Sequence, residues 1–105
     1  MTKKQKKFKK KHGFYEHESY GLDIHLIEWL LPRLKHFRKN LNGYPSGLSE
    51  KKWDKVLKQI EEGLTIHITD NYWYLENDEK DIKRDTKKVL KASRLLGKHL
   101  YDLWD

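Results

Sequence analysis

Between residues 22 and 41, the chain places an apolar side chain at every third or fourth position. These side chains are Ile27, Leu30, Leu34, Phe37 and Leu41. An α-helix completes a turn in about 3.6 residues, so this spacing gathers them on one face of one helix. Pro32 stands inside the pattern, and the stripe keeps its phase on both sides of the proline. The segment therefore predicts a long amphipathic helix that is kinked at Pro32, not two separate helices.

The start of this helix and the start of the next carry residues that cap helices. Asp23 is expected to cap the first helix, because its carboxylate can accept hydrogen bonds from free N–H groups of the first turn. Residues 43–45 (Gly-Tyr-Pro) are typical of a turn, since glycine tolerates the left-handed conformation that ends many helices. Ser49 is then expected to cap a second helix, over residues 49–68.

Residues 64–70 admit two interpretations. The alternation of Leu64, Ile66 and Ile68 with other residues is typical of a short strand, and Gly63 could end the second helix just before it. A strand needs a partner, and the sequence shows no second one. Continuation of the helix to about Ile68 is therefore the preferred prediction.

A third helix is predicted from residue 78 to residue 104. Its apolar and small residues recur in steps of four and three, which is the pattern of a coiled-coil seam. The seam residues are Ile82, Thr86, Val89, Ser93, Leu96, Leu100 and Leu103. Because a seam of this length is more than the core of three helices can cover, we expect a homo-oligomer, most simply a dimer.

The predicted fold is all-α, with three main helices in one domain over residues 14–105 and a basic arm over residues 1–13. Charged residues make up 37% of the chain and hydrophobic residues 36%, so the core must be small. Besides Met1, the arm offers one apolar side chain, Phe8, which is too little buried surface to offset the entropy of ordering. The arm is therefore expected to be disordered.

The arm also holds the whole net charge of the chain, +7, because basic and acidic residues are equal in number beyond residue 13. Its seven lysines could bind nucleic acid by neutralising phosphates, or they could form a solubilising tail. These lysines are Lys3, Lys4, Lys6, Lys7, Lys9, Lys10 and Lys11.

One flank of the first predicted helix combines aromatic and basic side chains. Guanidinium groups pair with phosphates and aromatic rings stack on bases, so the region predicts a site for an anionic nucleotide-type small molecule. The predicted ligand-binding residues are Trp29, Arg33, Lys35, His36, Arg38 and Tyr44. Lys35 and Arg38 point to the opposite flank from Arg33, so a neighbouring subunit would have to complete the site. Two simpler interpretations stay open: a solvated helix boundary, or an Arg33 that pairs with a carboxylate and holds the bundle.

No motif in the sequence predicts catalysis. A glycine-rich phosphate loop, a nucleophile elbow and a His-Glu-x-x-His pair are all missing from it. His25 and Glu28 have a spacing that a metal could use, but a metal–carboxylate bundle needs a second such pair, so a surface pair is preferred. The chain is thus expected to be neither an enzyme nor a holder of a metal or cofactor. Zero cysteines and the lack of a long apolar run favour the cytoplasm over a secreted or membrane setting.

Several short sequence motifs, taken in order, resemble those of a known group. They are Leu22-Asp23, Leu30-Leu31-Pro32-Arg33-Leu34-Lys35 with Phe37, Gly43-Tyr44-Pro45, Leu48, Trp53 and the closing Leu100-x-x-Leu103-Trp104-Asp105. This order resembles a family of small bacteriophage-encoded proteins without an assigned activity. The resemblance implies a mostly helical fold and the cytoplasm of an infected bacterium, and it carries over no catalytic residue.

The resulting hypothesis is an accessory binding protein that sequesters an anionic nucleotide-type ligand, in a counter-defence role. Two alternatives stay open. One is a nucleic-acid-binding protein that uses the lysine-rich arm, and the other is an inhibitor that masks a host protein with its exposed aromatic residues.

Overall fold

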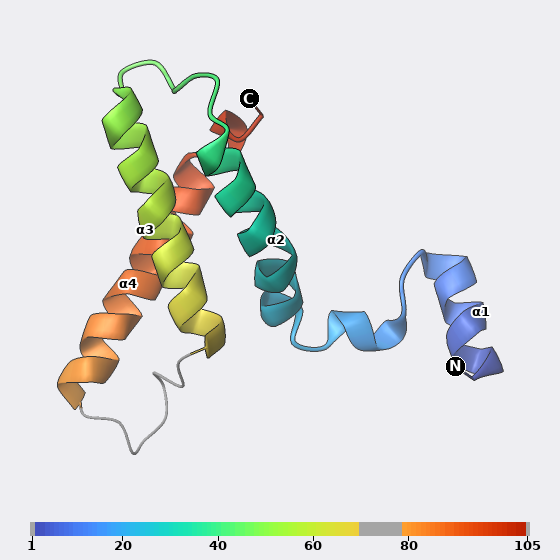
Figure 1. Cartoon of the computed structure of the whole chain (residues 1–105). Coiled ribbons are helices and arrows are strands. Elements are labelled where there is room, and N and C mark those ends of the chain that lie inside the picture. Colours follow the sequence, from blue (N-terminus) through green and yellow to red (C-terminus); the bar gives the residue numbers. More distant parts are fainter. Residues whose placement is uncertain (1, 70–78, 105) are drawn as a thin grey trace.

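The computed structural model describes residues 2–69 and 79–104. Within these ranges every regular element is a helix, which confirms the all-α prediction (Figure 1). The elements are α1 (Lys3–His12), the short 3₁₀ helix η1 (Glu16–Ser19), α2 (Leu22–Lys39), α3 (Glu50–Thr69), α4 (Glu79–Lys98) and the 3₁₀ helix η2 (Leu100–Asp102). The α-helices therefore number four in the described ranges, one more than the three main helices predicted.

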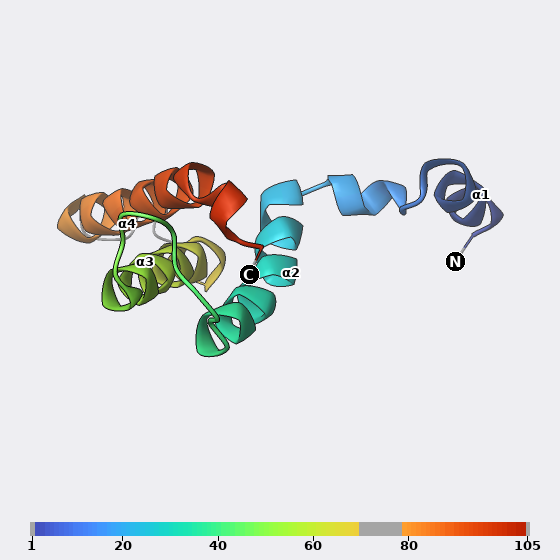
Figure 2. The ribbon, with the colours of Figure 1, turned by 90° about the horizontal axis from the view of Figure 1, so that it is seen from above.

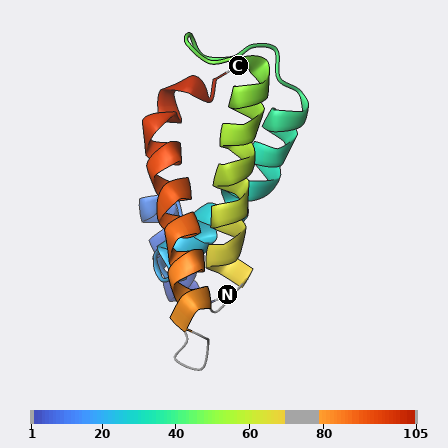
Figure 3. The ribbon, with the colours of Figure 1, turned by 90° about the vertical axis from the view of Figure 1, so that its left-hand side faces the viewer.

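Helix α3 is the centre of the bundle. It packs against both α2 and α4, whereas no Cα atom of α2 lies within 8 Å of one in α4. Seen from above, α3 and α4 lie next to each other and α2 stands apart from α4 (Figure 2). The view from the side shows α3 and α4 running alongside each other over most of their lengths (Figure 3).

The core is built mainly on α3, as its position requires. Its three largest fully buried side chains, Trp53, Leu57 and Ile60, all come from this helix. Of the predicted stripe, Ile27 and Leu34 are buried and the other three members are half-buried. The last of these, Leu41, lies beyond α2, which ends at Lys39 and not at residue 41. The helix continues through Pro32, as expected, and the kink there stays a prediction.

Helices α3 and α4 approach closely at Gly63. A Cβ atom on Gly63 would lie 2.3 Å from the Cβ of Ala92 and 2.5 Å from the carbonyl oxygen of Lys88. These separations are far below van der Waals contact, so the packing of the two helices depends on a missing side chain. Gly63 therefore lies inside α3, at a place where the helix crosses α4, and it does not end the helix. Helix α3 continues to Thr69, which confirms the helical interpretation of residues 64–69. Asp70, the last residue of that stretch, lies outside the described residues.

The two predicted caps have different outcomes. Ser49 does cap α3, since its Oγ accepts a hydrogen bond from the backbone N–H of Lys52 at 3.2 Å. The prediction that Asp23 caps α2 is wrong: the N-cap is Gly21, in the left-handed conformation with φ of 59°. Asp23 instead lies in the first turn of α2, where its Oδ2 atom is 2.6 Å from Nε2 of His67 on α3.

The hydrogen bond with His67 is the largest cause that lowers the pKa of Asp23 below its ordinary value of 3.8. A carboxyl whose pKa is lower in the folded state stabilises the fold at neutral pH, and this stabilisation is lost as the pH falls through the folded pKa. We therefore expect Asp23→Asn to weaken the acid dependence of the melting temperature between pH 7 and pH 3. The matched control is Glu28→Gln, an exposed carboxylate on the same helix. An unchanged acid dependence in Asp23→Asn would contradict the assignment.

The C-terminal helix is shorter than the sequence predicts. Helix α4 ends at Lys98 instead of residue 104, and η2 follows it after His99. The His99 side chain is buried, with its ring edge-on to Trp53 at 5.2 Å between centroids and its Nδ1 atom 2.9 Å from Oδ2 of Asp102. These contacts tie the end of α4 to α3 and to η2. The predicted start at residue 78 lies outside the described residues, and a dimer through the seam stays a prediction.

Residues 3–12 form α1, where the sequence predicts a disordered arm. Thr2 and Gln5 form a reciprocal capping box at the start of this helix, and Gly13 ends it in the left-handed conformation with φ of 86°. Both caps satisfy backbone groups that a disordered chain would leave to water. Phe8, the one apolar side chain of the helix, contacts the ring of Phe14 edge-on at 5.7 Å.

Candidate functional site

Helix α1 projects from the bundle. In the described chain it packs against η1 and against no other helix, and both Figure 1 and Figure 2 show it at the far side of α2 from α3 and α4. Lys9 lies over the ring of Tyr15, with Nζ 4.6 Å from the ring centroid, which holds the helix against the segment that follows it. The bundle therefore presents a separate basic element at one end.

The seven lysines surround most of α1. Successive residues turn by about 100° in a helix, so Phe8, Gln5 and His12 share one narrow strip and the lysines occupy the remaining circumference. All seven are exposed, and none forms an ion pair with any residue in the described ranges. The helix has no acidic residue. Such a surface offers uncompensated positive charge to any anion that approaches it.

Trp29 and Arg33, two of the predicted ligand residues, lie together on α2. The guanidinium of Arg33 stacks over the Trp29 ring at 4.3 Å, and its Nη1 atom donates a hydrogen bond of 2.7 Å to the Trp29 carbonyl oxygen. The Trp29 side chain remains more than half exposed. This arrangement holds Arg33 on its own helix, so the guanidinium does not pair with a carboxylate within the described residues.

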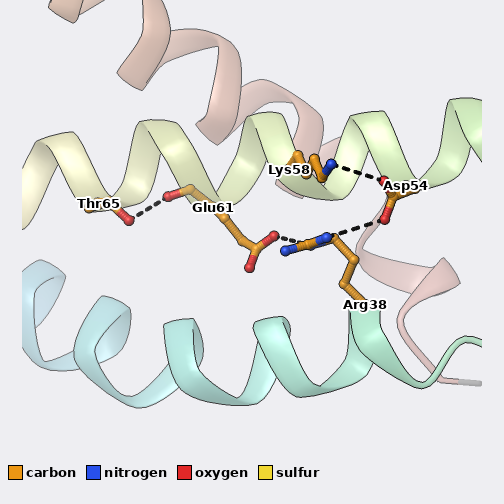
Figure 4. A network of polar contacts seen from close by, with 5 residues as sticks. All are labelled: Arg38, Asp54, Lys58, Glu61 and Thr65. Carbon is orange, nitrogen blue, oxygen red and sulfur yellow. Dashed lines mark hydrogen bonds and ion pairs between the residues drawn. The ribbon is translucent and has the colours of Figure 1, made fainter.

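Arg38, a third predicted ligand residue, points toward α3 (Figure 4). Its Nε atom donates to Oε2 of Glu61, and its Nη1 atom lies 3.4 Å from Oδ1 of Asp54. The hydrogen bond to Glu61 is the main cause that raises the pKa of Arg38 above its ordinary value. Glu61 is buried, and its second oxygen, Oε1, has no hydrogen-bond partner among the described residues. The positive charge of Arg38 is thus already used to compensate a buried carboxylate.

The remaining predicted ligand residues are dispersed. Lys35 and His36 are exposed on α2, while Tyr44 lies in the loop between α2 and α3. The structure therefore brings together Trp29 and Arg33 alone and does not gather all six residues around one cavity.

A cleft that the sequence did not predict lies where the α2–α3 loop meets the C-terminal segment. It has a volume of about 310 Å³ and is lined by Gly43, Tyr44, Pro45, Ser46, Trp53, Asp102 and Trp104. The Tyr44 and Trp104 side chains are largely exposed. His99 and Asp102 are three residues apart, and this spacing is the one local signal in the sequence for their contact. The position of His99 beside Trp53 has no local signal.

Metal ligands do not gather in the part of the chain that the structure describes. Residues 2–69 and 79–104 contain no group of three or more histidine, aspartate or glutamate side chains that could hold a metal ion. His25 and Glu28 lie on the exposed side of α2. The described helices also include none that is long and apolar enough to cross a lipid bilayer.

Comparison with protein-family profiles, with curated proteins and with solved structures finds no match to this chain.

Proposed function

We propose that this protein is a binding protein that holds nucleic acid through α1. The observation that supports the proposal most strongly is the charge of that helix. Its ten residues include seven exposed lysines and no acidic residue, and within the described ranges it packs on none of α2, α3 and α4. Clustered lysines on a projecting element are the electrostatic footprint of nucleic-acid-binding proteins. The remainder of the chain is neutral in net charge, so the net charge of the protein comes from this N-terminal element.

The lysines would act on phosphates and not on bases. Each lysine that neutralises a phosphate releases condensed counterions, and this release provides salt-sensitive affinity without sequence preference. Lysine is a compact point charge without the planar geometry that reads base edges in pairs of hydrogen bonds. The one apolar residue of α1, Phe8, is engaged with Phe14, which leaves no free aromatic ring on this helix for stacking on a base.

Binding would also stabilise α1 itself. Like charges four residues apart repel on a helix, and Lys3–Lys7, Lys6–Lys10 and Lys7–Lys11 have this spacing. A helix of ten residues is marginal in water even without such repulsion. Phosphates between the lysines would remove the repulsion. Binding of nucleic acid should therefore increase the helical content of α1.

Two other hypotheses stay predictions. A nucleotide-type ligand at Trp29 and Arg33 would meet one guanidinium and one ring on an open helix surface, because Arg38 is paired with Glu61. An inhibitor that masks a host protein would use exposed rings such as Tyr44 and Trp104. The phage setting, with its counter-defence role, rests on the sequence resemblance alone.

The test compares lysines on α1 with lysines on the bundle. We expect replacement of Lys4, Lys7 and Lys11 by glutamine to weaken duplex DNA binding. It should also reduce the slope of log affinity against log salt by up to about 3, roughly one for each lost phosphate contact. The matched control replaces Lys51, Lys52 and Lys55, three exposed lysines of α3, and should leave affinity and slope nearly unchanged.

Deletion of residues 1–13 completes this test. Because α1 packs on no helix of the bundle, the truncated chain should keep its melting temperature while it loses most DNA retention. Equal losses in the two triple variants, or full retention after the deletion, would contradict the proposal. Fluorescence anisotropy at several salt concentrations measures both affinity and slope.

A further inference from the structure

The cleft between the α2–α3 loop and the C-terminal segment has aromatic walls. Tyr44 lines it from the loop, Trp104 lines it from the C-terminal segment, and the buried Trp53 lines it from α3. Its volume of about 310 Å³ lies within the range of small-molecule sites. Figure 1 and Figure 3 both show the C-terminal segment, in red, near this loop, and Figure 1 shows α1 beyond the opposite end of α2. The cleft is therefore separate from the basic helix.

The rings of Tyr44 and Trp104 are free to contact a ligand. The two residues are 57% and 84% exposed. Neither ring contacts another ring or a cationic side chain within the described residues. Trp29, by contrast, already carries the guanidinium of Arg33 at 4.3 Å. Because the face of an aromatic ring is electron-rich, uncovered rings around one cleft favour a cation as the ligand.

The one charged side chain that lines this cleft is negative. It is Asp102, whose Oδ2 atom lies 2.9 Å from Nδ1 of His99. His99 is itself buried, with its ring edge-on to Trp53 at 5.2 Å, so it fixes the position of the carboxylate. The other oxygen, Oδ1, forms no hydrogen bond or ion pair within the described residues. Lys98 lines an adjoining hollow and not this cleft, so the lining attracts cations and repels anions.

Both sides of the cleft are held by local hydrogen bonds. In the loop, the backbone N–H of Leu48 donates to the carbonyl oxygen of Pro45 at 3.1 Å, and Gly47 completes this turn with a φ of 88°. In η2, the backbone N–H of Asp102 donates to the carbonyl oxygen of His99 at 2.9 Å. The backbone on each side is thus formed before a ligand arrives, which reduces the entropy that binding would cost.

We propose that this cleft binds a small quaternary ammonium cation, with the rings of Tyr44 and Trp104 against its methyl groups and the carboxylate of Asp102 near its charge. A quaternary ammonium group has no N–H, so aromatic walls leave none of its hydrogen bonds unmade. Aromatic side chains are the common means by which proteins recognise such cations. The site lies apart from α1, and the proposal does not depend on the binding of nucleic acid.

Choline and its uncharged carbon analogue dimethylbutanol test the proposal, because the two have the same shape and differ in charge. We expect choline to bind with a dissociation constant of about 1 mM, which is well inside the limit for a ligand of its size. The alcohol should bind about 10-fold more weakly, because it has no charge for the rings and the carboxylate to attract. The titration is made at pH 8, where an ordinary histidine is neutral. In NMR spectra, the indole N–H signal of Trp104 should shift and that of Trp29 should not.

Substitutions on one short segment locate the site. Trp104→Ala should weaken choline binding by roughly 5- to 30-fold, the range for loss of one cation–π contact. Asp102→Asn should weaken it by about 5-fold, because it removes the negative charge. Tyr101→Ala is the matched control and should bind choline like the wild type, since Tyr101 is 90% exposed in η2 and does not line the cleft.

Three results would overturn the proposal. They are equal affinities for choline and for the alcohol, the lack of saturable binding up to about 50 mM choline, and equal losses in Trp104→Ala and Tyr101→Ala. Should Asp102→Asn melt at a lower temperature through its altered contact with His99, Tyr44→Ala replaces it. Tyr44 is an exposed loop residue, and its loss should weaken choline binding as much as the loss of Trp104.

Discussion

Replacement of Gly63 by alanine should lower the stability of the bundle by about 2 kcal/mol, within the range for overpacked cores. For a domain of this size, that corresponds to a melting temperature lower by roughly 10 °C. The added Cβ would lie 2.3 Å from the Cβ of Ala92 and 2.5 Å from the Lys88 carbonyl oxygen. A backbone oxygen cannot rotate out of the way, so α3 and α4 would have to separate along their contact. The loss should exceed the gain of up to about 1 kcal/mol that alanine brings to a helix in place of glycine.

Gly97 provides the matched control for this substitution. It lies in α4, and a Cβ atom there would have no heavy atom within 4 Å. Gly97→Ala should therefore stabilise the protein, by up to about 1 kcal/mol, through helix propensity alone. Combining Gly63→Ala with Ala92→Gly should recover part of the loss, because it removes one of the two clashes. Equal melting temperatures for the two single alanine variants would show that the close approach of α3 and α4 is not formed.

Replacement of Arg38 by methionine should cost about 3–5 kcal/mol, the range observed when one partner of a buried ion pair is removed. Methionine keeps most of the apolar stem of Arg38 but leaves Glu61 without its positive partner. The Glu61 side chain is only 8% exposed, and its Oε1 atom has no hydrogen-bond partner among the described residues. An uncompensated carboxylate at that depth would favour unfolding or protonation.

Lys58→Met is the control within the same network. Lys58 lies 3.6 Å from Asp54, and its side chain is 62% exposed, so this pair should contribute no more than about 1 kcal/mol. A second substitution, Glu61→Leu, added to Arg38→Met should restore much of the lost stability, because it removes the stranded charge. Urea unfolding measures all of these variants. If Arg38→Met keeps full stability and instead loses affinity for an anionic ligand, the ligand-binding role predicted for Arg38 is supported over its role in the bundle.

Helices α2 and α3 could be predicted from sequence because their signals are local. The apolar stripe from Ile27 to Leu41 and the cap at Ser49 involve residues within a few turns of each other, and hydrogen bonds within one helix satisfy the backbone. The charge of α1 follows from composition alone, since seven of its residues are lysines. The low apolar content of residues 1–13 predicts disorder, and the capping box of Thr2 and Gln5 is a local signal that favours the helix instead.

The sequence by itself determined an all-helical chain with a basic N-terminal element, and the tertiary structure decided which charges and surfaces remain free. Asp23 lies beside His67, 44 residues away, so it does not cap its own helix. Arg38 pairs with Glu61, 23 residues away, so it does not join Arg33 in one site. Helices α2 and α4 both pack on α3, and no Cα atom of one lies within 8 Å of a Cα atom of the other. Each outcome depends on contacts between residues far apart in the chain, and helical periodicity records only which face of a helix is apolar, not which partner covers it.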